Sequence, residues 1–190
     1  MKKRTTTIAK TFLGFGLIAM ALSSCKKDED LVKVPEPDLN ESEVITTFKI
    51  TFADVNGSQP TVSASFIDLD GDGGNPPSAF DTIYLAPSTS YSAEILLLNE
   101  AANPTDTISN EVLDEAVDHL FCFTPSGANV SITRTDSDGV YELGLQSQWI
   151  TGAASDGTTQ IVLKHQPGIK DGSCSPGETD IELNFNTKIQ

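Results

Sequence analysis

Alternation of apolar and polar residues with a period of two is the feature that most restricts the fold of this chain. It is clearest near residue 190, where Ile181, Leu183, Phe185 and Ile189 share one face. The residues between them, together with Asp180, form the opposite, polar face. Strict alternation over this length is typical of a half-buried β-strand, because a helix repeats every 3.6 residues instead.

The same pattern recurs through most of the chain. The other candidate strands, in chain order, are 44–52, 62–66, 82–86, 91–99, 120–123, 130–134, 140–148 and 158–165. Residues 109–118 differ, because their apolar residues fall four apart, as in a short helix. About eight or nine strands separated by Gly- and Asp-rich turns predict an all-β, antiparallel, immunoglobulin-like β-sandwich over 44–190, with one short helix near 109–118.

Residues 1–24 have the pattern of a signal peptide. Four basic residues precede the apolar run 12–22, which is shorter than the roughly 20 residues that a membrane span needs. The run ends in Leu22-Ser23-Ser24-Cys25, which resembles a bacterial lipobox. That resemblance implies cleavage before Cys25 and acylation of this cysteine. An ordinary signal peptide with a chance cysteine is the alternative.

Residues 25–43 predict a flexible tether, because they are rich in charge, Pro and Ser. Their start, Lys26-Lys27-Asp28-Glu29-Asp30, resembles the signal that sends Bacteroidota lipoproteins to the outer face of the outer membrane. A solvated charge cluster that opens a linker explains these residues equally well. We therefore expect a lipid-anchored outer-membrane protein exposed at the cell surface, with the periplasmic face as the alternative.

The charge of the chain limits its partners. It has 27 acidic and 12 basic residues, a net charge of -15, and removal of 1–24 with its four basic residues makes this -19. Such a surface does not neutralise phosphates, so nucleic acid is not an expected partner. It also disfavours an anionic membrane surface, so the lipid must provide the membrane attachment.

Three carboxylates in one turn suggest a cation site. Asp68, Asp70 and Asp72 alternate within a Gly-rich loop, a spacing that can wrap the hard cation Ca²⁺. The complete calcium loop has Glu at its twelfth position, where this chain has Ala79. A solvated turn is the alternative, because Asp and Gly are common turn residues. Asp136 and Asp138 repeat the pattern in weaker form.

Two cysteines remain once Cys25 is acylated. An even number of thiols in an oxidising compartment predicts a disulfide between Cys122 and Cys174. Closing a loop of this length contributes about 4 kcal/mol in the chain-entropy account. A buried, free Cys122 is the alternative.

The sequence contains two histidines, His119 and His165. Glu115 and His119 would share a helix face and could bind zinc, but a structural zinc site needs four ligands and only His165 is otherwise available. A capping or surface role for His119 is therefore favoured. Because no serine can be paired with either histidine from spacing, we expect no enzymatic activity.

Three further residues have open interpretations. Trp149 is expected to pack partly buried in the sandwich, with an exposed sugar-stacking platform beside Tyr141 as the alternative. Thr82 and Thr107 lie in Asp-Thr-Ile tripeptides, which resemble the O-glycosylation sequence of Bacteroidota. Thr107 could instead cap the short helix.

Several segments together resemble a group of small, uncharacterised Bacteroidota lipoproteins. They are residues 43–47, 68–74, 97–100, 118–123, 151–154 and 177–181. Members of this group are sometimes named type 1 periplasmic-binding fold proteins. That fold has two α/β lobes with many helices, whereas the alternation in this chain predicts strands.

We expect a non-catalytic binding or interaction module that holds a protein, glycan or cation at the cell surface, with Ca²⁺ as the candidate cofactor. A structural accessory subunit of an outer-membrane complex is the alternative, and an exposed apolar strip on the last strand would favour it. A calcium-dependent hydrolase is the third interpretation.

Overall fold

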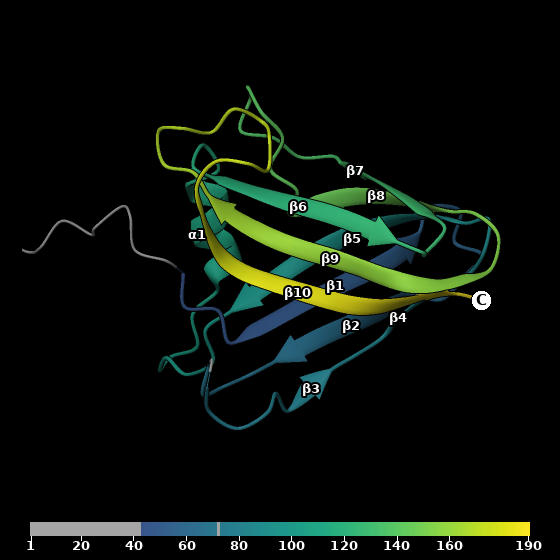
Figure 1. Ribbon diagram of the computed structural model, residues 1–190, viewed down its shortest axis with the longest axis horizontal. Helices are drawn as coiled ribbons and strands as arrows, with labels where there is room; N and C mark the ends of the chain where they lie inside the picture. The colour runs from purple at the N-terminus through teal and green to yellow at the C-terminus, as the bar shows by residue number, and fades with distance from the viewer. Residues whose placement is uncertain (1–42, 72) are drawn as a thin grey trace, which may run out of the picture. The chain divides into compact units, whose positions relative to one another are not determined.

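Ten strands and one helix build two facing sheets in the computed structural model, which describes residues 43–71 and 73–190 (Figure 1). The elements are β1 (Thr47–Asp54), β2 (Val62–Ile67), β3 (Ala79–Phe80), β4 (Ile83–Leu85), β5 (Ser90–Leu98), α1 (Ile108–Asp114), β6 (His119–Ser126), β7 (Val130–Arg134), β8 (Gln146–Thr151), β9 (Ser155–His165) and β10 (Glu178–Ile189). The predicted all-β sandwich is confirmed. All of these elements belong to the compact unit Pro37–Gln190, and the unit Met1–Glu36 lies outside the described residues.

The sandwich pairs a six-stranded sheet, β3-β2-β1-β5-β8-β7, with a four-stranded sheet, β4-β10-β9-β6. Neighbouring strands are antiparallel except β4, which runs parallel to the end of β10. The predicted antiparallel arrangement is wrong at this one edge. The chain leaves the six-stranded sheet after β3 and joins the other sheet beside β10. At the crossing point, the Asp81 carboxylate accepts a hydrogen bond from the Ser65 amide.

The inward faces of both sheets form the core. Phe48 and Phe52 of β1 and Phe185 of β10 are essentially inaccessible to solvent, as the alternation predicts. Trp149 is fully buried and packs edge-on to Phe52 at 4.9 Å, while its indole N–H donates to the Ser147 hydroxyl. Trp149 is therefore more deeply buried than the expected partial burial, and the sugar-stacking alternative is wrong.

The strand expected over 140–148 begins later than predicted. β8 starts at Gln146, because the Asp136 carboxylate accepts the amides of Gly144 and Gln146 and holds the preceding residues in a loop. Gly144 has φ +100°, a conformation that favours glycine. The predicted boundary is wrong because a side-chain hydrogen bond replaces the sheet ladder there.

Candidate functional site

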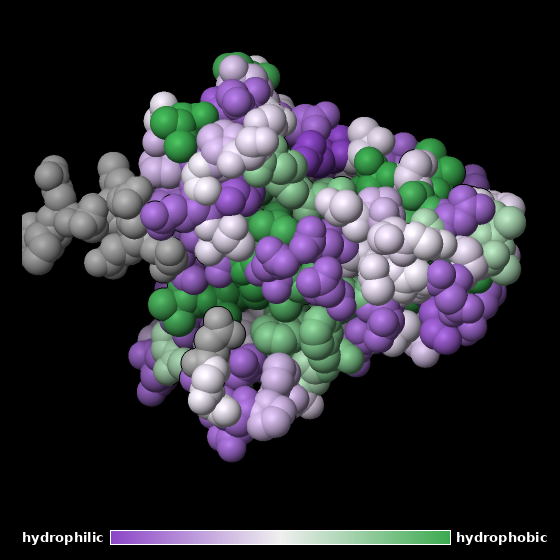
Figure 2. Space-filling view, in the orientation of Figure 1, coloured by the Kyte–Doolittle hydropathy of each residue, from purple (hydrophilic) through white to green (hydrophobic). Residues whose placement is uncertain are grey.

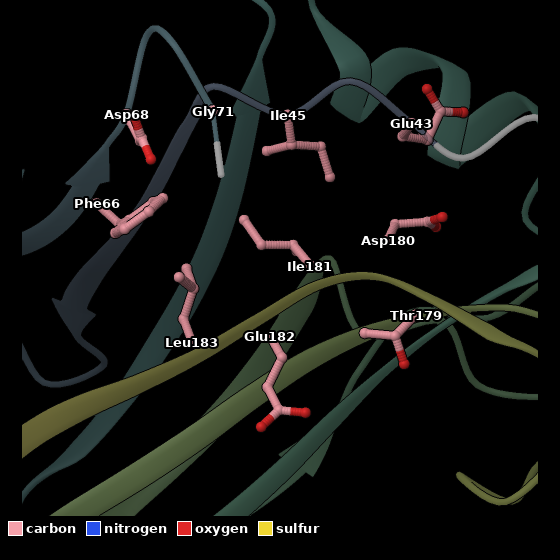
Figure 3. Close-up of a pocket in the computed structure, with 10 residues that line it drawn as sticks. All are labelled: Glu43, Ile45, Phe66, Asp68, Gly71, Thr179, Asp180, Ile181, Glu182 and Leu183. Carbon is pink, nitrogen blue, oxygen red and sulfur yellow. The ribbon is translucent and has the colours of Figure 1, made fainter. Parts of the chain in front are cut away.

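One pocket of about 400 Å³ lies between the start of β10 and the segments that flank β1 and β2 (Figure 3). Its lining residues are Glu43, Ile45, Phe66, Asp68, Gly71, Thr179, Asp180, Ile181, Glu182 and Leu183. Acidic groups therefore share the pocket with an apolar wall. Figure 3 shows Asp68 beside Phe66 at one end of the pocket, and Glu43 and Asp180 at the other.

Carboxylates crowd the Glu43 end of this pocket. Burial, together with the nearby carboxylates of Glu111, Asp180 and Glu115, raises the pKa of Glu43 to about 7. Burial also raises the pKa of Asp180. Crowded carboxylates disfavour one another's ionised forms, so this end of the pocket favours a positively charged occupant.

Asp180 turns inward because of a bulge in β10. Thr179 pairs with Lys164 and Ile181 with Leu163, so Asp180 has no pairing partner on β9. A bulge of this kind changes the direction of a side chain. The Asp180 side chain has no exposed surface, and neither carboxylate oxygen has a hydrogen-bond partner within residues 43–71 and 73–190. The prediction that Asp180 lies on the polar outer face is wrong.

Asp180 faces the two histidines of the chain. Its Oδ2 lies 3.8 Å from His119 Nε2, and both side chains are inaccessible to solvent. His119 opens β6 and lies opposite His165 of β9, with the two rings stacked at 4.7 Å and nearly parallel. Glu115, His119 and His165 each place one ligand atom within 4.8 Å of the others. The register of β6 with β9 thus brings together residues far apart in sequence.

The tautomer of His119 follows from its contacts. Nδ1 lies 3.1 Å from the Glu115 carbonyl oxygen, so it donates there and Nε2 has a lone pair. Burial lowers the pKa of His119, which favours this neutral form. The expected capping role is confirmed, because Glu115 is the C-cap of α1. A surface location is wrong, and so is the shared helix face, since α1 ends at Asp114.

The Asp-rich turn places its carboxylates in different surroundings. Asp68 is buried in the pocket, and its Oδ1 has no hydrogen-bond partner in the described part of the chain. Asp70 is exposed and accepts bonds from the amide and side chain of Asn75, which lower its pKa. Asp72 lies outside the described residues. Ca²⁺ binding to this turn stays a prediction, with Asp68 as its buried ligand.

The expected disulfide between Cys122 and Cys174 is present. It ties the loop after β9 to β6, and two further contacts hold the same loop. Lys170 Nζ lies 2.8 Å from Asp138 Oδ2, with both side chains 3% exposed, and Gln166 donates to two carbonyl groups of the loop. Asp138 therefore anchors this loop through Lys170. The weaker Asp136–Asp138 repeat thus has a structural role that needs no cation.

The remaining predicted positions lie apart from the pocket or outside the description. Thr82 lies between β3 and β4, and Thr107 is the N-cap residue of α1 without a side-chain capping bond; both are half-buried. Cys25 and the tether up to residue 42 are outside the described residues. The described part of the chain contains no helix long and apolar enough to cross a membrane.

Comparison with known protein families, with curated proteins and with solved structures returns no match for this chain.

Proposed function

We propose that this protein is a lipid-anchored module at the outer membrane that binds a cationic ligand in the acidic pocket and catalyses no reaction. The membrane part of the proposal rests on the lipobox-like Leu22-Ser23-Ser24-Cys25 and the tether that follows it. The binding part rests on the pocket. The pocket is lined by the start of β10, by Phe66 of β2 and by the segments before β1 and after β2, so both sheets contribute to it.

One observation supports a cationic ligand above all others. Asp68 and Asp180 bring buried carboxylate oxygens into one pocket, and these atoms have no hydrogen-bond partner in the described ranges. A buried carboxylate without a partner destabilises the fold, and a cation or a donor from a ligand removes that cost. Ca²⁺ fits the oxygen-only end at Asp68, and a lysine or arginine side chain of a partner protein fits the whole pocket.

The environment of the histidines supports a non-catalytic role. His119 donates to a main-chain carbonyl and faces Asp180, and His165 stacks on His119. A serine or cysteine nucleophile needs a histidine or similar base within hydrogen-bond distance. Both histidines are buried, and within residues 43–71 and 73–190 no serine or cysteine side chain is hydrogen-bonded to either ring.

The accessory-subunit alternative receives no support from β10. Glu182, Asn184 and Asn186 point outward from this strand, so its solvent face is polar rather than an apolar strip. Polar side chains cover much of the surface over β9 and β10 in Figure 2. A binding pocket therefore explains the described surface better than a strand-mediated clamp.

Thermal melting of the full chain in detergent tests the binding proposal. The chain is treated with chelator and then given millimolar Ca²⁺ or a short lysine peptide. A ligand at 100 times its Kd stabilises by about 2.7 kcal/mol, which raises the Tm by roughly 5–10 °C for this size. Asp68→Asn should abolish the rise, and Asp156→Asn, at an exposed position on β9, should leave it unchanged.

The proposal fails if neither probe changes the Tm, or if the rise survives Asp68→Asn. The lipid anchor is tested separately, by growing cells that produce the full chain with radioactive palmitate. Cys25→Ser should lose both the label and the membrane association. Protease treatment of intact cells then distinguishes the outer face from the periplasmic face.

A further inference from the structure

The acidic pocket has carboxylates at both of its ends and an apolar wall between them. Asp68 lies at one end, and Glu43 and Asp180 lie at the other (Figure 3). The side chains of Ile45 and Ile181 lie between the two ends and line the same pocket. A single cation at one end would leave the carboxylates at the other end without a counterion.

These carboxylates have no cationic partner in the described part of the chain. Asp68 is 8% exposed and the Asp180 side chain has no exposed surface, yet Asp68 Oδ1 and both Asp180 oxygens lack a hydrogen-bond partner within residues 43–71 and 73–190. No lysine or arginine in the same ranges forms an ion pair with Glu43, Asp68 or Asp180. Buried charges in folded proteins are normally paired, so the missing positive charge is expected from a ligand.

Backbone hydrogen bonds tie the Asp68 end of the pocket to the segment that carries Glu43. The Asp68 amide donates to the Thr46 carbonyl at 2.8 Å. The amide and the hydroxyl of Thr46 both donate to the Leu98 carbonyl of β5. Glu43 and Ile45 lie on the same stretch of chain, directly before β1. A ligand that spans the two ends is therefore selected by its length.

We propose that the pocket binds a linear aliphatic diamine or polyamine, with one ammonium group at Asp68 and another at Glu43. This inference rests on the proposed cation-binding function and names its ligand class. The pocket volume of about 400 Å³ lies in the range of roughly 300–1,000 Å³ that small-molecule sites have. The methylene chain of the ligand packs on Ile45 and Ile181, and the buried Asp180 adds negative charge at the Glu43 end.

The two acidic ends favour this ligand class over the other cations that the pocket could accept. A Ca²⁺ ion at Asp68 leaves the apolar wall uncovered and the Glu43 end without a counterion. A lysine side chain within a peptide carries one ammonium group, so it neutralises one end. Free lysine has a second ammonium group but also a carboxylate, which Glu43 and Asp180 repel.

The ligand class is tested by calorimetric titration of the full chain, purified in detergent and treated with chelator, with the Cys122–Cys174 disulfide kept oxidised. Putrescine and cadaverine are compared with n-butylamine and n-pentylamine, the monoamines of equal length. Each added methylene should strengthen monoamine binding by up to about fourfold, through burial against the apolar wall. Each diamine should bind at least about tenfold more tightly than its matched monoamine, because of the second charged contact.

Two variants locate the ammonium groups. Asp68→Asn and Glu43→Gln should each reduce the affinity for putrescine to about that for n-butylamine. Asp156→Asn, at an exposed position on β9, should leave it unchanged. Glu43→Gln should also leave the response to Ca²⁺ unchanged, because that response depends on Asp68. The comparison of diamines with monoamines uses the wild-type chain, so it serves even if a variant does not fold.

Two results would overturn the inference. One is that the diamines bind no more tightly than monoamines of the same length. The other is diamine binding that neither Asp68→Asn nor Glu43→Gln weakens. If Ca²⁺ or the lysine peptide raises the Tm while the diamines do not bind, the diamine inference fails and the cation-binding proposal stands. If none of these probes binds, both fail.

Discussion

Replacing Asp138 by asparagine should destabilise the domain by removing one buried charge. Asp138 Oδ2 lies 2.8 Å from Lys170 Nζ, and Oδ1 accepts the amides of Val140 and Tyr141. Although burial opposes the shift, the hydrogen bonds from Lys170, Tyr141 and Val140 lower the pKa of Asp138 from 3.8 to about 2. Asparagine keeps an oxygen for the two amides, so the substitution mainly removes the ion pair.

The magnitude follows from that lowered pKa. It corresponds to about 1–2 kcal/mol once screening by solvent is allowed for. For a domain of this size, this lowers the Tm by roughly 3–6 °C. A carboxylate with a lowered pKa in the folded state stabilises fully above its ordinary pKa. The difference in unfolding free energy between wild type and variant should therefore be constant above about pH 4. It should shrink toward zero as the pH falls toward 2.

The assay is urea or thermal unfolding at several pH values, with a matched ion pair as control. Lys188 and Asp156 also form a pair, at 3.2 Å, but their side chains are 45% and 78% exposed. Asp156→Asn should change the free energy of unfolding by less than about 0.5 kcal/mol. The reasoning is refuted if Asp138→Asn costs no more than Asp156→Asn, or if its cost does not diminish in acid.

Two further substitutions test the loops around this pair. Replacing Cys122 and Cys174 together by alanine should cost about 2–4 kcal/mol in unfolding free energy, because the unfolded chain regains the entropy of an open loop; an unchanged Tm would contradict this. Gly144→Ala should be more destabilising than Gly139→Ala in the same unfolding assay. Both glycines have positive φ, but a Cβ at Gly144 would lie 2.8 Å from Phe121 Cβ, whereas a Cβ at Gly139 meets no atom within 4 Å. Equal effects would show that backbone strain alone matters.

The fold could be predicted because burial repeats along the strands. Alternation from Ile181 to Ile189 identified the inward face of β10 correctly, since Leu183, Phe185 and Ile189 are buried. The boundary of β8 could not be predicted in the same way. It depends on the Asp136 carboxylate, whose hydrogen bonds to Gly144 and Gln146 leave no trace in the hydrophobic pattern.

The alternation of apolar and polar residues also could not predict the parallel pairing of β4 with β10. Residues 79–85 carry one short run of strand-forming residues, yet β3 and β4 belong to different sheets. Periodicity reports which face of a strand is buried, but not which neighbour it pairs with. The choice of partner here is made by contacts across the chain, such as the bond from the Gln190 amide to the Leu85 carbonyl.

The histidine site was harder to predict for a related reason. Spacing could connect only Glu115 with His119, because four residues separate them on the chain. His165 reaches the site through the pairing of β9 with β6, and Asp180 through a bulge that reverses the direction its position in the alternation predicts. One register step of β10 would return Asp180 to solvent and leave the two imidazoles without an acidic neighbour on that strand. The bulge is therefore the structural feature that buries Asp180 beside His119. Deleting Thr179 should expose the Asp180 carboxylate and return its raised pKa toward the ordinary value, as carboxyl NMR would measure, while the strands around Phe185 keep their pairing.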